Sequence, residues 1–137
     1  VLAAGAVGWD WIGINLDGGG ALMAFRMRSA DGRALWAGGT LRSPNGRVTV
    51  FDPGHVSFEP KRRWRSPRTG TEYPVSMRVK AGDMEIELQP LLDDQELDAR
   101  TSTATIYWEG AVRALRAGVP VGRGYLELTG YWRRLEL

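Results

Sequence analysis

The sequence has no cysteine and only one histidine, His55. A chain without cysteine cannot form disulfide bonds, zinc thiolate sites, iron–sulfur clusters or a thiol nucleophile. A single histidine excludes metal sites built from several imidazoles, and it makes a Ser-His-Asp triad depend on one residue in a loop-like stretch. We therefore expect no metal site built from cysteine or from several histidines, and we expect His55 to be a partly exposed residue at the end of a strand.

Long apolar runs are also missing. No run approaches the roughly 20 apolar residues that cross a bilayer, so we expect no transmembrane segment. Val1–Val7 is apolar, but it is uncharged and too short for a complete signal peptide. Because no initiator methionine precedes Val1, we expect the chain to begin inside a longer protein.

Excess charge of either sign is small, since the formal net charge is +2. The cations gather in Lys61–Arg68, around Trp64, and in Arg133–Arg134. So few cations around one aromatic residue predict a solvated loop, and we expect no nucleic-acid partner.

Helical periodicity is almost absent from the chain. Short runs rich in Val, Ile, Trp, Tyr and Thr alternate with turn clusters such as Pro44–Gly46 and Asp52–Gly54, where Gly or Asn accepts positive φ. The sequence therefore predicts a single all-β domain over residues 1–137. The expected strands are Trp9–Leu16, Ala21–Arg28, Leu35–Leu41, Arg47–Phe51, His55–Glu59, Val75–Lys80, Met84–Gln89, Thr103–Arg113 and Gly124–Trp132.

Antiparallel strands in this meander order, about eight or nine of them, protect their edges most simply by closing into an up-and-down barrel, with a β-sandwich as the alternative. We expect Pro60–Pro74 to be a long loop that covers one barrel end. Asp93–Asp98 is expected to be a solvated turn or a single helical turn. Glycines inside strands, such as Gly13, predict a bend or a bulky neighbour that needs the space.

Strand alternation divides each strand into two faces. In Ala21–Arg28, the apolar set Met23, Phe25 and Met27 opposes Arg26 and Arg28. This split predicts that the apolar set packs in the core.

The last two strands each place tyrosine and glutamate on one face. Tyr107 shares a face with Glu109, and Tyr125 shares one with Glu127 and Tyr131. If these faces point inward, the carboxylates and phenols line one cavity, where desolvation would raise the carboxylate pKa and suit proton transfer. If they point outward, they form a surface ladder in which Glu127 pairs with an arginine.

Several motifs resemble the second lipocalin-like domain of the AttH family, which is related to hydroxyneurosporene synthase (carotenoid hydratase). They are Gly-Trp-Asp-Trp at 8–11, Leu-Asp-Gly-Gly at 16–19, Trp-Arg-Ser-Pro-Arg-Thr-Gly at 64–70, Tyr-Trp-Glu-Gly-Ala-Val at 107–112 and Gly-Arg-Gly-Tyr-Leu-Glu-Leu-Thr-Gly-Tyr at 122–131. The resemblance implies a calycin-type barrel and a parent of two tandem barrels, of which this chain lacks the first. It also implies a secreted or periplasmic location, because members are often described as secreted hydrolases.

The same resemblance implies chemistry on greasy polyenes without a metal or organic cofactor. Relatives include hydratases that add water to an isoprenoid double bond and fungal proteins that steer cyclisations. The hydratases carry an acid on a strand similar to Gly122–Glu127, which here has Glu127 in place of aspartate.

Three functions follow from these patterns. The first is binding of an apolar small molecule such as an isoprenoid, lipid or polyketide, with Glu109 or Glu127 orienting it. The second is a hydratase, isomerase or cyclase in which Glu127 or Glu109 delivers a proton and Tyr125 steadies the cation. The third is docking to a second lipocalin-like domain or to another copy of the chain. The predicted ligand-binding residues are Trp9, Trp11, Met23, Phe25, Tyr107, Trp108 and Tyr131.

Overall fold

The computed structural model describes residues 4–136, so the first three residues of the apolar N-terminal run lie outside the described part. It confirms the all-β class: the elements are twelve strands and one short 3₁₀ helix, η1 (Pro53–His55), at whose end His55 is exposed. Within residues 4–136, no helix has the length and hydropathy to cross a bilayer. The strands are β1 (Gly8–Leu16), β2 (Ala21–Arg28), β3 (Ala34–Arg42), β4 (Val48–Phe51), β5 (Val56–Pro60), β6 (Trp64–Arg65), β7 (Glu72–Tyr73), β8 (Met77–Ala81), β9 (Met84–Pro90), β10 (Glu96–Ala99), β11 (Thr105–Arg116) and β12 (Val119–Thr129).

Ten of the strands form one curled antiparallel sheet. Its order is β4-β3-β2-β1-β12-β11-β9-β8-β5, with β10 paired to β11. Because β12 pairs with β1, the first and last long strands meet, as they do in an up-and-down barrel. The two ends of the sheet, β4 and β5, follow one another along the chain through η1.

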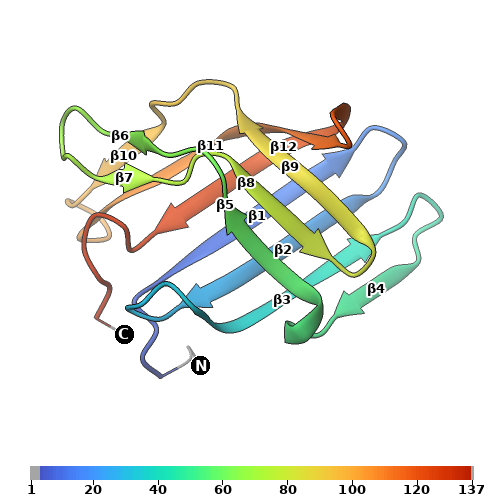
Figure 1. Ribbon diagram of the computed structural model, residues 1–137, viewed down its shortest axis with the longest axis horizontal. Coiled ribbons are helices and arrows are strands. Elements are labelled where there is room, and N and C mark those ends of the chain that lie inside the picture. Colours follow the sequence, from blue (N-terminus) through green and yellow to red (C-terminus); the bar gives the residue numbers. More distant parts are fainter. Residues whose placement is uncertain (1–3, 137) are drawn as a thin grey trace.

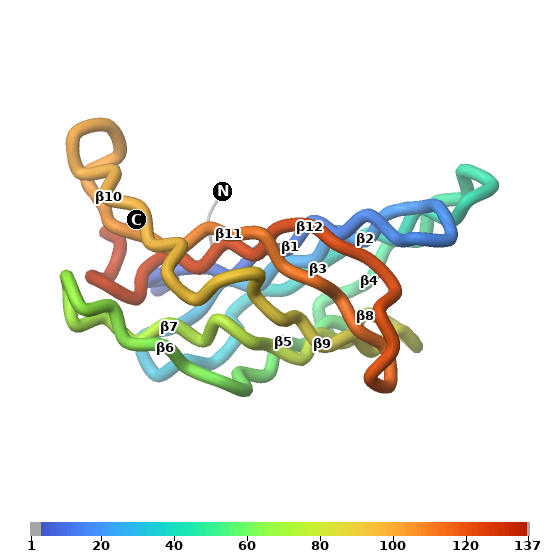
Figure 2. Tube along the Cα trace, turned by 90° about the horizontal axis from the view of Figure 1, so that it is seen from above, coloured from blue at the N-terminus to red at the C-terminus, as the bar shows by residue number. Residues whose placement is uncertain are grey.

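The curl folds the sheet into two layers. Figure 1 shows β5, β8 and β9 crossing in front of β1, β2 and β3, and Figure 2 shows the layers from above. β5 lies against β2 and β3. The residues between 4 and 136 form no backbone ladder from β4 to β5, so these two strands are the edges of the sheet.

The inner face of the sheet is the hydrophobic core. Alternate residues such as Ile12, Leu126 and Trp108 point inward and meet Met77 and Ile86 from the opposite layer, and all five are almost fully buried. Each buried aliphatic side chain contributes roughly 1.5–3 kcal/mol. The space between the layers is thus filled by the chain's own side chains.

The prediction of a long loop over Pro60–Pro74 is wrong, because this segment contains a small hairpin, β6–β7, in which Trp64 stacks on Tyr73 with ring centroids 6.3 Å apart. Asp93–Asp98 was predicted to be a turn, and this is only partly right, because β10 begins within the segment at Glu96.

Glu96 explains why both segments are ordered. Its side chain is 3% exposed and accepts hydrogen bonds from Ser66 Oγ (2.6 Å), Thr69 Oγ1 (2.8 Å) and the Tyr73 hydroxyl (2.7 Å). Burial, and next the Glu96 carboxylate, raise the pKa of Tyr73. One carboxylate therefore fixes the β6–β7 hairpin against β10.

The basic segment is largely neutralised by acidic neighbours. Arg62 forms a two-bond pair with Asp93 (2.7 and 2.8 Å), and Arg68 pairs with Asp94. The guanidinium of Arg62 holds the pKa of Asp93 below its usual value. The basic segment Lys61–Arg68 and the acidic run Asp93–Asp98 are therefore held together by these ion pairs.

Candidate functional site

The inner face carries a charged cluster where an apolar set was expected. Arg26 and Arg28 of β2 are buried, whereas Met23 and Phe25 are half-buried on the opposite face, so the predicted split exists but its direction is reversed. Met27, the third member of the predicted apolar set, shares the face of Met23 and Phe25 but is only 6% exposed. The physical reason is Asp10, which β1 places inside, opposite Arg26 in the ladder. Arg26 Nε donates to Asp10 Oδ2 (2.5 Å), and Arg28 Nη1 donates to Asp10 Oδ1 (2.7 Å).

This cluster fastens distant parts of the chain together. The Tyr131 hydroxyl donates to Asp10 Oδ1 (2.8 Å), and the Arg28 guanidinium lies 3.9 Å from the Tyr131 ring centroid. Arg26 Nη1 donates to the Phe58 carbonyl of β5 (3.0 Å), across the gap that the backbone ladder leaves open. Burial, and next the Asp10 charge, raise the pKa of Tyr131.

The deeply buried polar atoms of the cluster are paired within the chain. Among the described residues, no buried side-chain nitrogen or oxygen lacks a hydrogen-bond partner. The inner face is therefore a packed core in which the fully buried polar side-chain atoms of residues 4–136 are hydrogen-bonded.

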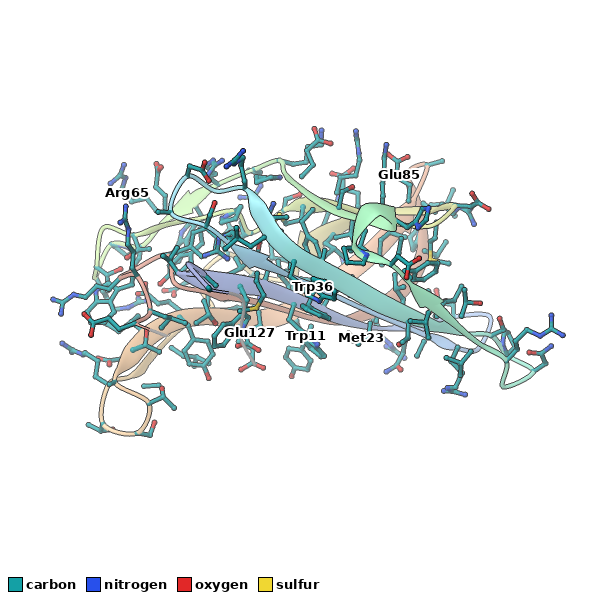
Figure 3. The ribbon with its side chains drawn as sticks, turned by 90° about the horizontal axis from the view of Figure 1, so that it is seen from below. Trp11, Met23, Trp36, Arg65, Glu85 and Glu127 are labelled. Atoms are coloured by element: carbon teal, nitrogen blue, oxygen red, sulfur yellow. The ribbon has the colours of Figure 1, made fainter. Side chains whose placement is uncertain are left out.

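Most of the predicted site residues lie on the outer face of the sheet. Of the two alternatives for Glu109 and Glu127, the structure has the outward one, with Tyr107 and Tyr125 on the same face. No arginine or lysine nitrogen of residues 4–136 lies within 4.0 Å of either carboxylate, so the predicted arginine pair does not form. Figure 3 shows Trp11, Met23, Trp36 and Glu127 on this face.

Two predicted residues are separated from the others. Trp108 is fully buried in the core, where its Nε1 donates to the Asp93 carbonyl (2.8 Å). Tyr131 follows the end of β12 and turns inward to Asp10. Neither of these two predicted ligand-binding residues therefore lines a hollow together with Glu127.

Ladder register brings the outer-face residues into one row across neighbouring strands. Phe25 of β2 is opposite Trp11 of β1, Trp11 is opposite Glu127 of β12, and Glu127 is opposite Glu109 of β11. Opposite residues of an antiparallel ladder have Cβ atoms about 4.5–5.5 Å apart, so their side chains interact. Two aromatic side chains and two carboxylates are therefore neighbours in one row.

A groove of about 610 Å³ lies beside this row, between the outer face and the chain after β12. Trp9 and Tyr107 rise from the sheet, Thr103 comes from the turn before β11, and Trp132 stands on the C-terminal segment. Clefts of about 300–1,000 Å³ with apolar walls and a few polar groups are typical of small-molecule sites.

Glu127 is one of the charged groups that line the groove, together with Arg133, Arg134 and Glu136 of the C-terminal segment. Its Oε1 accepts a hydrogen bond from Trp9 Nε1 (2.9 Å) and another from Thr129 Oγ1 (3.1 Å). Beside it, the Tyr107 hydroxyl donates to Glu109 Oε2 (3.4 Å), and burial and then the Glu109 charge raise the pKa of Tyr107. Two donors hold Glu127 in a fixed position as an acceptor.

Sequence reasoning missed the wall formed by Trp132. It extended the last strand through this residue, but β12 ends at Thr129 and Gly130, with φ of +91°, turns the chain away. The Gly130 signal was present in the sequence, because glycine readily adopts positive φ.

Comparison with known proteins places these features in a family. A family model described as AttH-like matches residues 1–131. The solved structure of a Nitrosomonas europaea protein described as an AttH matches with 53% sequence identity and a TM-score of 0.90, covering 96% of this chain and 41% of that one. No curated protein matches the chain.

A second solved structure, kievitone hydratase from Nectria haematococca, shares the lipocalin-like fold with a TM-score of 0.71 at 21% identity, covering 96% of this chain and 42% of that one. The chain thus spans about two fifths of the length of both solved proteins. With a family model that extends over nearly all of its residues, this chain belongs to the AttH-like family.

Proposed function

We propose that this domain binds an uncharged, apolar small molecule, such as an isoprenoid or polyketide, in the groove on the outer face of its sheet. The observation that carries the proposal is the meeting of Trp9, Tyr107 and Trp132 around the hydrogen-bonded carboxylate of Glu127. The aromatic walls would remove the ligand from water, and Glu127 would accept a hydrogen bond from a hydroxyl on it.

The filled interior supports the outer site. A ligand between the layers would have to displace packed side chains such as Trp108 and Met77, and displacing well-packed core residues costs several kcal/mol. A ligand in the groove displaces only water.

Fluorescence titration with Nile red, an uncharged apolar dye, tests this proposal. We expect saturable binding that weakens about tenfold in Trp132→Ala, a loss of about 1.4 kcal/mol. Trp36→Ala is the matched control, because Trp36 is 52% exposed on the same face and does not line the groove. Absence of saturable binding, or equal losses in both variants, would contradict the proposal.

Docking of a second lipocalin-like domain on the same face is the second candidate function. It is favoured by the exposed Trp36 and Tyr125 together with the greater length of the solved AttH protein. To test it, the part of the Nitrosomonas europaea protein outside the match would be expressed separately and added to this chain. Docking predicts protection of the Trp36 indole from a collisional quencher, and unchanged quenching would exclude it.

A further inference from the structure

A second hollow, of about 400 Å³, adjoins the groove on the outer face. Its lining is a mixture of aromatic rings, one thioether and two carboxylates: Trp9, Trp11, Phe25, Met27, Glu109 and Glu127. It shares only Trp9 and Glu127 with the first groove. This composition differs from that of a simple apolar site, because negative charge and aromatic surface occur together.

Glycines leave room for the aromatic walls of the hollow. A Cβ atom on Gly13 would lie 2.6 Å from Trp11 Cη2, so the indole lies directly over this glycine. Phe25 lies in the same way over Gly38, where a Cβ atom would be 3.1 Å from Cε1. Trp11 and Phe25 both line the hollow, and the face of an aromatic ring carries the negative part of its quadrupole.

The two carboxylates reinforce that negative potential. Glu109 and Glu127 are directly opposite in the β11–β12 ladder, and like charges at opposite positions destabilise a sheet. Tyr107, Trp9 and Thr129 donate hydrogen bonds to them, but these groups are neutral. The hollow therefore has two negative charges that no cation of residues 4–136 offsets by an ion pair.

The chemistry of the walls selects the kind of cation. A metal ion prefers a shell of oxygen, nitrogen or sulfur ligands, and residues 4–136 contain no group of three or more acidic or histidine side chains placed to hold one. A quaternary ammonium group has methyl groups that pack on rings and on the Met27 thioether, and its charge is attracted by ring faces.

We infer that this hollow binds an organic cation of the quaternary ammonium class, with Trp11 and Phe25 against its methyl groups and Glu109 and Glu127 balancing its charge. The site goes beyond the apolar-ligand groove, and it stands if that groove binds nothing. Where both sites are occupied by one molecule, the ligand is an amphiphile with a cationic head and an apolar tail.

Choline and 3,3-dimethylbutan-1-ol form the decisive pair of probes, because they have nearly the same shape and differ in charge. The probes would be titrated by NMR into the chain labelled at its indole and backbone nitrogens, at constant ionic strength. We expect choline to bind at least about fivefold more tightly than the alcohol and to shift the Trp11 indole signal. Equal affinity of the two probes would overturn the inference.

Variants separate this site from the groove. We expect Trp11→Ala and Glu109→Gln each to weaken choline binding at least about fivefold, while Trp132→Ala, which changes only the groove, leaves it unchanged. Glu87→Gln is the matched control for charge, since Glu87 is also half-buried and forms no ion pair with the described part of the chain, residues 4–136. If Glu87→Gln weakened choline binding as much as Glu109→Gln does, the effect would come from the net charge of the protein, and the assignment would be overturned.

A second arm distinguishes the source of the cation. Binding of the chain to phosphatidylcholine vesicles would be measured by co-sedimentation and compared with the NMR titration of free choline. Vesicle binding that Trp11→Ala abolishes assigns the head group of a lipid, whereas binding of free choline alone assigns a soluble cation. Failure of both to bind would overturn the inference.

Discussion

Asp10 holds two buried guanidinium groups with a single carboxylate. Its side chain is fully buried, so the charge balance of the cluster depends on contacts among Asp10, Arg26 and Arg28 rather than on water. Removing one member of such a group leaves a buried charge without compensation, which destabilises a protein far more than replacing the whole group by apolar residues.

Replacement of Asp10 by asparagine should therefore be strongly destabilising. We expect Asp10→Asn to lower the free energy of unfolding by about 3–5 kcal/mol in denaturant titration. Asp31→Asn is the control, because Asp31 pairs with Arg33 at the surface and such pairs contribute about 0–1 kcal/mol. Similar losses in the two variants would show that the buried cluster does not fasten the barrel.

Two tyrosines should resist ionisation while the chain is folded. The structure raises the pKa of Tyr73 and Tyr131 above the ordinary value of 10.0, so the folded state binds their protons more tightly than the unfolded state does. Their contribution to stability is complete below pH 10 and is lost as the pH rises beyond it.

An alkaline titration followed by phenolate absorbance measures this effect. Of the four tyrosines, we expect these two to ionise only together with unfolding. Tyr131→Phe should remove one of these late-titrating groups, and smooth ionisation of all four near pH 10 in a folded chain would contradict the assignment.

At the scale of elements, alternation indicated which residues share a face but not which face is inside. The two faces of β2 were separated correctly, yet Met23 and Phe25 point outward because Arg26 and Arg28 find Asp10 on β1. The sequence indicates this direction only when strands are compared in pairs, because Asp10 on β1 and the two arginines on β2 then fall on the same face. The long strands themselves were predictable, since their β-branched and aromatic runs are bounded by turn residues.

The short strands β6, β7 and β10 were not predictable from local sequence. They are too short to show periodicity, and their order depends on Glu96, which lies 30 residues from Ser66 along the chain. Contacts at such separation are invisible to patterns read within one segment.

Glu96→Ala should release the β6–β7 hairpin. Three hydroxyl groups would lose a charged acceptor, and we expect hydrogen-exchange protection of residues 64–73 to fall at least about tenfold with a loss of about 2–3 kcal/mol in stability. Glu72→Ala, in the same hairpin, removes an exposed carboxylate that pairs with Arg65 and should change little. Unchanged protection in Glu96→Ala would refute the proposed anchoring.

In the whole molecule, one face of the sheet forms the core and the other carries the candidate site. The inner face is packed and includes a bonded charge cluster, whereas the outer face presents Trp9, Trp11 and Phe25 beside Glu109 and Glu127. Several residues of the candidate site could be selected from the sequence because tyrosine and glutamate lie two positions apart in Tyr107–Glu109 and Tyr125–Glu127, and thus on one face of each strand. Their outward direction could not, because it depends on how the whole sheet curls.

The location of an uncharged apolar ligand is the most direct test of this account. We would titrate farnesol, an isoprenoid alcohol, into the isotope-labelled chain and follow the backbone and indole signals by NMR. Binding in the groove predicts shifts at Trp9, Tyr107 and Trp132, with Phe58 and Met77 in the core unchanged. Shifts centred on Phe58 and Met77, with the outer face unchanged, would place the ligand between the layers and contradict the account.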